Sequence, residues 1–390
     1  MSSKTNIVIV NTLPFPSGAA SVNRILSYSK GLVEIGNNVT VYSTSYGVDT
    51  LVHDINGIHY KAFRTISNEK IKNVYSLFTA LFQLLKTLFS SREHVDVVIL
   101  VSNSLLLIYP LYFVTKISNI KFVQEKSEFP FVLNYNSFLG KLFAKFYVST
   151  TYRLFDGLII MTHKLSEYFK DKIRKDCKTI VVPMTVEQER FAVRSENLLG
   201  DYIAYCGDIG GNKDGVQNLI TAFSYISSDY PYLKLILIGG SKDPNERLIL
   251  DEYVKQIKCK NVVFYGSVTR DEIPQLLVNA KVLALARPSS LQSAGGFPTK
   301  LGEYLSTGNP TIVTSVGDIP LYIVDEKHAF LVPPDDNHAF AERIKYVLNN
   351  YEYAMKVAEN GKSLVYDTFN YRVQAERIHS FLLELNYEQN

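Results

Sequence analysis

The sequence of 390 residues has few cysteines and almost no net charge. Its three cysteines, Cys177, Cys206 and Cys259, stand far apart, which excludes a disulfide framework and a cysteine-based zinc site and favours a reducing compartment. Lysine and arginine exceed aspartate and glutamate by 41 − 38 = 3, so the charge balance gives no reason to expect a nucleic acid partner. What remains is the composition of an ordinary globular protein.

Long apolar runs are scarce as well. The run from Ile7 to Val10 is only strand-length and leads into proline and phenylalanine, so no signal peptide is expected. The stretch from Val97 to Tyr112 is apolar enough to suggest a membrane span, but Asn103 and Pro110 interrupt it. Two strands, or a strand and a helix, are predicted there instead. We therefore expect a cytoplasmic protein, with peripheral attachment to the inner face of a membrane left open.

Residues 136–155 are the reason for leaving membrane attachment open. Lys141, Lys145 and Arg153 stand there among phenylalanine, leucine and tyrosine residues. A helix of this composition either packs on the core with its cations in water or lies on an anionic membrane face. Packing on the core is the first expectation.

Short apolar strands alternate with helical patterns through most of the chain, which predicts an α/β fold. The opening strand from Asn6, the helix Ser21 to Ile35 and the strand Val39 to Tyr42 form a βαβ unit of Rossmann type. The length predicts two or three domains, and the polar, irregular stretch from Met184 to Leu199 is the expected linker. We predict two Rossmann-like, doubly wound domains at 1–186 and 187–368, followed by a helix at 369–390.

One stretch in the second half combines the features of an anion site. An apolar strand pattern ends at Arg287, a glycine-rich loop follows, and Pro298 opens a helix. The amides and dipole of a helix N-terminus favour anions at such a loop. Lys300 and Glu303 are three residues apart on this helix, so a cation for phosphate and a carboxylate for sugar hydroxyls project from one face. A surface ion pair is the alternative explanation.

A second glycine-rich loop follows the strand that begins at Tyr202. Gly207 and further glycines precede Lys213 at the start of a predicted helix, a composition typical of phosphate-binding loops. The loop is no Walker A motif, because aspartate and glycine follow Lys213 rather than serine or threonine. Gly239 directly follows another predicted strand, Leu233 to Ile238.

The first half offers weaker candidates. Gly18, in the loop after the first strand, would let the backbone approach a ligand closely. Glu125 and Glu128 follow the strand Ile120 to Gln124, at the end where open α/β sheets bind ligands, and His163 follows a later strand. These carboxylates would suit an acceptor hydroxyl; solvated loop charges and a structural histidine are the alternatives.

The segment from Phe297 to Leu305, with Gly308 and Pro310, resembles the donor-site signature P-T-K-x-x-E-Y-L-A-x-G-x-P of the family 4 (group 1) glycosyltransferases. The segment from Gly207 to Ala222 is similar to a second motif of that family, G-R-x(n)-K-G-x-x-x-L-I-x-A. The resemblance implies that Glu303 holds the ribose hydroxyls of a nucleotide and that a glycine of the first loop, here Gly18, faces the pyrophosphate.

Two positions depart from the family pattern. Gly295 stands where a second glutamate is usual, and Asp208 stands where the family has an arginine that meets the diphosphate. The backbone amides of residues 294–296 are the expected substitute for the glutamate, and Arg287 is the expected substitute for the arginine.

The resemblance implies the GT-B fold, in which two Rossmann-like domains face each other across a cleft. Residues 1–186 would bind the acceptor, residues 187–368 would bind the nucleotide-sugar donor, and the helix at 369–390 would cross back to the first domain. The implied reaction is retaining, hexosyltransferase-type transfer to a glycan or lipid-linked acceptor in cell-surface polysaccharide biosynthesis. No cofactor is implied, since the nucleotide-sugar is a substrate.

No clustered carboxylate motif stands in a strand-end loop of the second domain, so fixed cations rather than a metal are expected to stabilise the leaving group. The expected catalytic residues are Lys213, Arg287 and Glu303; the donor-binding residues are Gly18, Gly207, Gly239, Gly295, Gly296, Lys300 and Glu303; the acceptor-side residues are Glu125, Glu128 and His163; no metal ligand is expected.

Two other functions stay open from the sequence. A nucleotide-sugar 2-epimerase would use Glu125, Glu128 and His163 as its catalytic groups. A non-catalytic nucleotide-sugar binding protein is suggested by the departures at Asp208 and Gly295. Incubating a nucleotide-sugar without acceptor separates the first of these from a transferase.

Overall fold

The computed structural model of the chain describes residues 4–16, 20–47, 51–65, 70–90, 94–130, 135–193, 196–241 and 243–387. The chain forms two compact units. Unit 1 contains Met1–Thr185 and Tyr371–Asn390, and unit 2 contains Val186–Asn370.

Unit 1 is built on an eight-stranded sheet with the order β3-β4-β2-β1-β5-β6-β7-β8. Every neighbouring pair is parallel except β3 and β4, which form a hairpin. The strands are β1 Asn6–Asn11, β2 Asn38–Gly47, β3 Val52–Ile55, β4 Ile58–Thr65, β5 Val97–Val101, β6 Lys121–Lys126, β7 Gly157–Ile160 and β8 Lys178–Val181. The helices are α1 Ala20–Glu34, α2 Lys70–Ser90, α3 Leu105–Ile117, α4 Phe138–Thr151, η2 Tyr152–Leu154, α5 His163–Phe169 and α14 Tyr371–Tyr387.

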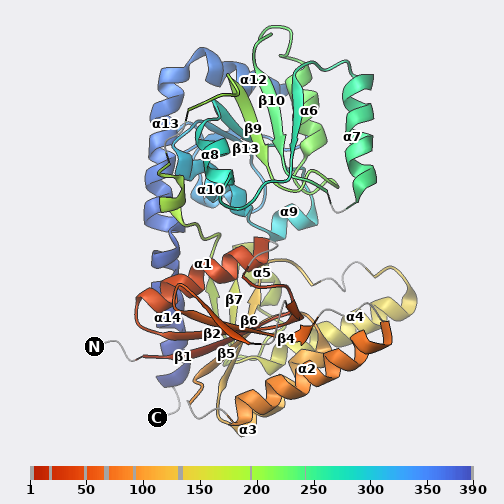
Figure 1. Cartoon of the computed structure of the whole chain (residues 1–390), viewed down its shortest axis with the longest axis vertical. Helices are drawn as coiled ribbons and strands as arrows, with labels where there is room; N and C mark the ends of the chain where they lie inside the picture. The colour runs from red at the N-terminus through yellow and green to blue at the C-terminus, as the bar shows by residue number, and fades with distance from the viewer. Residues whose placement is uncertain are drawn as a thin grey trace. The chain divides into compact units, whose positions relative to one another are not determined.

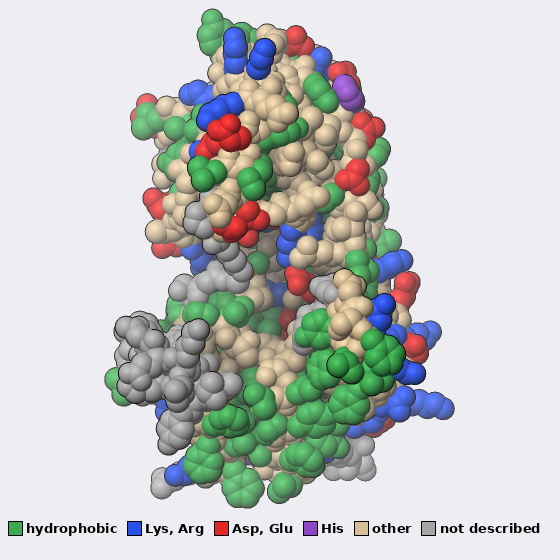
Figure 2. Space-filling model, turned by 90° about the vertical axis from the view of Figure 1, so that its right-hand side faces the viewer, with side chains coloured by type: hydrophobic (Ala, Val, Ile, Leu, Met, Phe, Trp, Pro, Cys, Tyr) green, Lys and Arg blue, Asp and Glu red, His purple; other side chains and the backbone are tan. Residues whose placement is uncertain are grey.

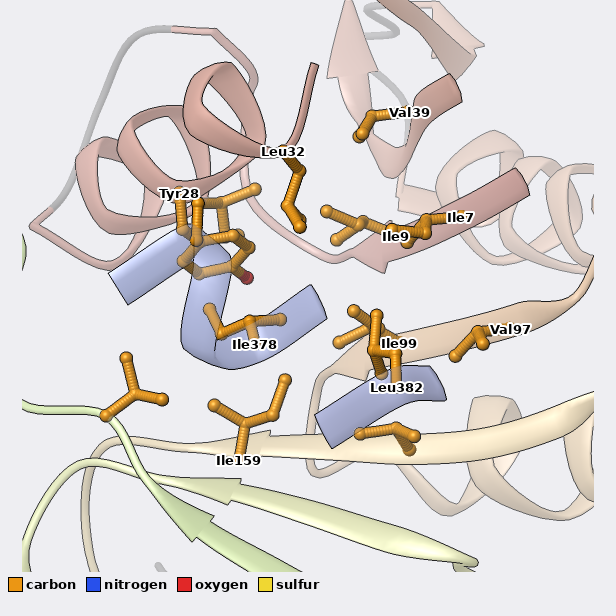
Figure 3. Packing of buried hydrophobic residues seen from close by; sticks show 14 of the residues in the cluster. Ile7, Ile9, Tyr28, Leu32, Val39, Val97, Ile99, Ile159, Ile378 and Leu382 are labelled. Atoms are coloured by element: carbon orange, nitrogen blue, oxygen red, sulfur yellow. The ribbon is translucent and has the colours of Figure 1, made fainter. Parts of the chain in front are cut away.

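The core of unit 1 joins the beginning and the end of the chain. Tyr28 and Leu32 of α1 point toward Ile378 and Leu382 of α14, next to the apolar residues of β1 (Figure 3). The two helices touch closely, since a Cβ on Gly31 of α1 would lie 2.6 Å from the Ala375 Cβ of α14. The last helix therefore completes the hydrophobic core of the unit that contains the first strand.

Unit 2 is built on a six-stranded parallel sheet with the order β11-β10-β9-β12-β13-β14 (Figure 1). The strands are β9 Tyr202–Cys206, β10 Lys234–Ile238, β11 Val262–Gly266, β12 Val282–Leu285, β13 Thr311–Thr314 and β14 Phe330–Val332. The helices are η3 Gln188–Phe191, α6 Val216–Ser224, α7 Pro244–Gln256, α8 Ile273–Val278, α9 Leu291–Gly295, α10 Thr299–Thr307, α11 Ile319–Tyr322, α12 Asn337–Asn349, α13 Tyr351–Leu364 and the π-helix η4 Val365–Phe369. The predicted α/β class with two parallel-sheet domains is confirmed.

The strand order of unit 2 reverses between β9 and β12. From β9 the chain runs outward to β10 and β11, then returns to place β12 on the other side of β9 and continues to β13 and β14. Crossovers therefore leave the carboxyl ends of β9 and β12 in opposite directions. Open α/β sheets bind their ligands at such a switch point.

Among the described residues, no helix combines the length and the apolar character needed to cross a bilayer. The apolar stretch from Val97 to Tyr112 divides into β5 and the first part of α3, and Pro110 lies inside that helix. The strand plus helix, one of the two structures predicted for this stretch, is what the structure contains.

Candidate functional site

The switch point of unit 2 is where the two glycine-rich loops of the sequence come together. One loop follows β9 and contains residues 207–215; the other follows β12 and leads through residues 286–290 into α9. Both strands are buried along their whole length, because each is a run of apolar residues covered on both faces. The sheet thus holds the two loops on a rigid base.

Asp214 is the centre of this site. Its carboxylate is only 6% exposed, and the Lys300 ammonium lies 2.5 Å from Oδ2. The Arg287 guanidinium, 2% exposed, lies with Nε 3.5 Å from Oδ1, and the Tyr205 hydroxyl donates to Oδ2 at 3.1 Å. One carboxylate therefore ties the loop after β9, the loop after β12 and the first turn of α10 together.

The charges of this cluster determine the protonation of Asp214. Burial by itself would raise the pKa of the carboxyl, but the charge and hydrogen bond of Lys300, together with the charge of Arg287, hold that pKa below its usual value. Asp214 is thus ionised at neutral pH. Two cations beside one carboxylate leave a local excess of positive charge at the carboxyl end of the sheet.

Close backbone contacts explain several of the glycines in the site. Gly215 has φ +68°, and a Cβ there would collide with the Ala286 carbonyl oxygen of the other loop. Gly239 has φ +132°, and a Cβ there would collide with the carbonyl oxygen of Gly207. The amides of Gly207 and Gly239 donate to the carbonyls of Ile238 and Gly266, each at 2.8 Å. These predicted donor-binding glycines therefore pack the loops tightly, with their amides engaged inside the unit.

Lys213 and Asp208 lie in the same loop with exposed side chains. The Lys213 carbonyl oxygen lies 3.5 Å from Arg287 Nε, so the residue adjoins the Asp214 cluster through its backbone. The Asp208 carboxylate accepts from the Gly210 amide at 2.9 Å. The aspartate that replaces the family's arginine thus shapes its own loop, as aspartates in turns do.

Glu303 lies one turn after Lys300 on α10, as predicted from their spacing. The two side chains have different ion-pair partners, since Lys300 pairs with Asp214 while Glu303 Oε1 lies 3.7 Å from Arg190 Nη1. The Glu303 side chain is 25% exposed. Its burial raises the pKa of the carboxyl, against the opposing charges of Arg190, Lys300 and Arg270.

The arginine beside Glu303 comes from a segment that the sequence marks only as a polar linker. Arg190 belongs to the short helix η3 and donates through Nη2 to the Arg270 carbonyl at 2.5 Å. Arg270 in turn pairs with Glu187 at 2.6 Å. No local pattern marks Arg190, because its partners stand about 80 and 110 residues further along the chain. Only the tertiary structure brings it to the site.

The loop after β12 leads into α9, where several backbone amides donate hydrogen bonds within the helix. Ser290 and Ser293 form a reciprocal capping box, the Ala294 amide donates to the Ser290 carbonyl, and the Gly296 amide donates to the Gln292 carbonyl. Two of the three amides expected to replace the missing glutamate at Gly295 are therefore engaged in the helix. The first turn of α10 has no side-chain cap, and within it the Leu301 amide donates to the Pro298 carbonyl at 3.1 Å.

The candidates of unit 1 occupy both buried and exposed positions. Gly18 lies outside the described residues. Glu125, at the end of β6, is buried and pairs with Arg24 at 2.8 Å, and Arg24 also donates to the carbonyls of Val182 and Pro183. Glu128 and His163 have exposed side chains, in the loop after β6 and at the start of α5.

A lysine that the sequence analysis overlooked lies at the same end of this sheet. Lys126 is buried, and its ammonium lies 2.5 Å from Oδ1 of Asn103, which follows the neighbouring strand β5. Burial lowers the pKa of this lysine to about 8, against the opposing charges of Glu125 and Glu128. No sequence pattern indicates this burial, since a lysine between two glutamates after a strand looks solvated.

Within the part of the chain that the structure describes, no group of three or more histidine, cysteine, aspartate or glutamate side chains is placed to hold a metal ion.

Comparison with known sequences finds a family that resembles unit 2. Residues 186–364 match the family described as glycosyl transferases group 1. Trehalose phosphorylase of Grifola frondosa is 26% identical over 155 residues, which cover 37% of this chain and 21% of that protein. The match therefore spans about a fifth of the curated relative's length.

Solved structures resemble the whole chain. Sucrose-phosphate synthase from Thermosynechococcus elongatus superposes with a TM-score of 0.76 at 16% identity, covering 98% of this chain and 99% of the other. HepE from Anabaena, solved in complex with UDP-glucose, superposes with a TM-score of 0.73 at 14% identity, covering 97% and 99%. At this identity the likeness establishes the GT-B fold. Unit 2 thus resembles the group 1 glycosyltransferases over residues 186–364.

Proposed function

We propose that the protein transfers a sugar from a nucleotide-sugar donor to a hydroxyl group of an acceptor, with retention of the anomeric configuration. The observation that carries the proposal is the cluster of Asp214, Lys300 and Arg287 at the switch point, with Glu303 one turn away. The cluster supplies fixed positive charge, and Glu303 supplies a carboxylate that can accept hydrogen bonds. A nucleotide-sugar needs both, the positive charge for its diphosphate and the carboxylate for its ribose hydroxyls.

The positive groups would stabilise the diphosphate leaving group. When the bond between the sugar and the phosphate breaks, the departing diphosphate gains charge, and fixed cations aimed at that charge lower the barrier. Lys300 is held in place by Asp214, and the uncapped first turn of α10 adds a partial positive charge beside it. Lys213, exposed in the neighbouring loop, completes the set of cations that we assign to the diphosphate.

Glu303 would hold the ribose. Its ionised carboxylate accepts hydrogen bonds, and two adjacent hydroxyl groups of a ribose can donate to its two oxygens. Arg190, 3.7 Å away, keeps a positive charge next to the carboxylate without covering it, since a quarter of the side chain stays exposed. Binding of UDP-glucose by HepE, a protein of the same fold, agrees with a donor of this class.

The acceptor is the less defined part of the proposal. We assign it to unit 1 and to the class of glycans and lipid-linked glycans, in cell-surface polysaccharide biosynthesis. A lipid-linked acceptor keeps its sugar at a membrane surface, so the proposal includes peripheral attachment of the protein to the inner face of that membrane. Mass spectrometry of the products from a panel of nucleotide-sugars and acceptors tests this assignment.

The diphosphate cations give a direct test of metal independence. Transfer should persist in excess EDTA, and Lys213→Ala should lower kcat/KM about a hundredfold, the usual scale for removing one charge-stabilising group. The matched control is Lys260→Ala, which removes an exposed lysine of unit 2 from a loop outside the site. Loss of transfer in EDTA with recovery on adding Mg²⁺ or Mn²⁺ would contradict the fixed-cation mechanism.

Two rival functions are separated by simpler assays. A nucleotide-sugar 2-epimerase would convert its substrate without acceptor, using Glu125, Glu128 and His163. The structure buries Glu125 against Arg24 and leaves Glu128 and His163 exposed at the ends of the neighbouring strands β6 and β7. A non-catalytic binding protein would bind a nucleotide-sugar without consuming it, so any measurable transfer excludes it.

A further inference from the structure

Unit 1 carries an apolar surface on three of its helices. Large hydrophobic side chains gather over this face of the unit (Figure 2). We define the three-helix surface by its most exposed members, which are Phe78, Phe82 and Phe89 of α2, Leu106, Phe113 and Ile117 of α3, and Phe138, Leu139, Leu142 and Phe146 of α4. Exposure reaches 69% at Phe82, 74% at Ile117 and 81% at Phe138. Patches of this kind on soluble proteins mark interaction sites.

The spacing of these residues places them on one side of each helix. Phe78 and Phe82 of α2 are four residues apart, as are Phe113 and Ile117 of α3. Residues 138, 142 and 146 of α4 repeat the same interval. Residues four apart share a helix face. Each helix therefore has an outer apolar stripe in addition to the side chains it buries in the core.

Contacts between the helices make the three stripes one surface. The helices α2 and α3 pack against each other. The Tyr109 hydroxyl of α3 lies 3.3 Å from Thr150 Oγ1 of α4, and the Tyr147 hydroxyl of α4 donates to the Asn103 carbonyl just before α3. The core thus fixes the three helices side by side, and their outer stripes form a continuous face.

The charges beside the stripes indicate what covers this face. The sequences of α2, α3 and α4 contain six lysines, three, one and two respectively, and no aspartate or glutamate. The chain as a whole has nearly equal numbers of basic and acidic residues, 41 and 38. Lys86, Lys141 and Lys145 have exposed side chains. An apolar face on helices that carry exposed lysines and contain no acidic residue is complementary to an anionic bilayer, whose headgroups attract the lysines while its acyl region accepts the rings.

A second copy of the chain is a poorer match for this face. A symmetric dimer brings the same surface patch together on both copies, so lysines would meet lysines without an acidic partner from these helices. We propose that the three-helix surface binds to the surface of an anionic lipid bilayer. This inference deepens the proposed function, because it names the surface through which the enzyme would reach a lipid-linked acceptor.

Vesicle co-sedimentation of the full chain tests the proposal. The wild type should sediment with vesicles of phosphatidylcholine mixed with phosphatidylglycerol, and more weakly with phosphatidylcholine alone. Lys141→Glu with Lys145→Glu should reduce the partition coefficient on the anionic vesicles about thirtyfold, which corresponds to about 1 kcal/mol for each lysine. Phe82→Ser, Phe113→Ser and Leu142→Ser together should reduce binding to both kinds of vesicle at least about tenfold.

Matched variants in unit 2 serve as controls. Leu248→Ser, Ile249→Ser and Leu321→Ser remove apolar side chains of similar exposure, and Lys260→Glu with Lys356→Glu reverses two exposed lysines. These variants should bind vesicles as the wild type does. UDP-glucose affinity, measured by calorimetry, should be unchanged in every one of these variants. A failure to bind UDP-glucose would count against the proposed donor site alone, not against the surface.

Three results would overturn the proposal. The wild type remaining in the supernatant with both kinds of vesicle is the first. The second is equal vesicle binding by the wild type and the Phe82, Phe113 and Leu142 variant. The third is a wild-type dimer, seen by sedimentation velocity, that the same three substitutions convert to a monomer, since this would assign the face to a second copy.

Discussion

Glu303→Ala should weaken nucleotide-sugar binding by roughly 2 to 4 kcal/mol, or about thirtyfold to a thousandfold, with the fold retained. The expected loss is that of charge-assisted hydrogen bonds from the ribose hydroxyls to the carboxylate. The Glu303 side chain is a quarter exposed, and Arg190, its ion-pair partner at 3.7 Å, also donates to the Arg270 carbonyl, so the substitution leaves Arg190 with another hydrogen-bond partner. Calorimetry with UDP-glucose measures the affinity, and circular dichroism checks the fold.

Two further variants sharpen this test. Glu303→Gln keeps the shape of the side chain and one acceptor oxygen, so it should lie between the wild type and Glu303→Ala. Glu352→Ala removes an exposed glutamate from α13 and should leave donor affinity unchanged. Equal affinity in the wild type and Glu303→Ala would mean that Glu303 is only the partner of Arg190.

The environment of Glu303 also predicts a pH dependence. Burial raises the pKa of its carboxyl, and only the ionised form can accept hydrogen bonds from both ribose hydroxyls. Donor affinity should therefore fall on acidification at a pH above the ordinary glutamate value of about 4.3. A nucleotide-sugar is the right probe, because it lacks a terminal phosphate that titrates near pH 6. The affinity of Glu303→Gln should not follow this titration.

The same pKa shift acts on stability with the opposite sign. Because the folded-state pKa of Glu303 is raised, its neutral form favours the folded chain. That contribution is fully present below the unfolded-state pKa and is lost as the pH rises through the folded-state pKa. Acidification should thus weaken donor binding while this one group adds to the stability of the donor-free protein. A general loss of structure at acid pH would instead lower both quantities.

The sequence predicted the frame of the candidate site in unit 2 for a physical reason. A buried parallel strand reads as an apolar run, so the pattern indicated β9 and β12. Glycine before a helix and a Lys-x-x-Glu interval are local features, and local spacing on a helix determines which side chains share a face. Gly207, Lys300 and Glu303 were found in this way.

The contacts within the site could not be predicted, because they join residues far apart in the chain. Asp214 looked like an ordinary loop aspartate, yet it meets Lys300, 86 residues further on. Arg190 stood in a stretch interpreted as a linker. Glu125 was predicted to face an acceptor, with a solvated loop charge as the alternative, yet Arg24, 101 residues before it, covers it. No spacing rule reaches across such distances. That a charged residue is buried can be inferred only when the structure shows the partner that pairs with it.

Glu125→Ala should destabilise the protein by about 3 to 5 kcal/mol, the usual cost of removing one partner from a buried ion pair. The side chains of Arg24 and Glu125 are 1% and 3% exposed, so the substitution leaves the Arg24 guanidinium buried without its carboxylate. For a unit of this size we expect Tm to fall by roughly 10 °C. Thermal unfolding followed by circular dichroism measures the change.

The neighbouring glutamate provides the control for this prediction. Glu128 is exposed three residues further on, and Glu128→Ala should change stability by less than about 0.5 kcal/mol. Replacing both partners by apolar residues, Arg24→Met with Glu125→Leu, should recover much of the loss, because no charge is then left unpaired. That recovery distinguishes an ion pair from simple packing.

The pair of measurements also decides what Glu125 does. If the carboxylate holds the carboxyl end of the sheet together through Arg24, the double variant regains stability and keeps donor binding, since the donor site that we propose lies in unit 2. If Glu125 instead acts on the acceptor hydroxyl, Glu125→Gln should unfold at the wild-type temperature and lose transfer with donor affinity unchanged. The buried contact with Arg24 at 2.8 Å favours the first outcome, and a wild-type Tm in Glu125→Ala would contradict it.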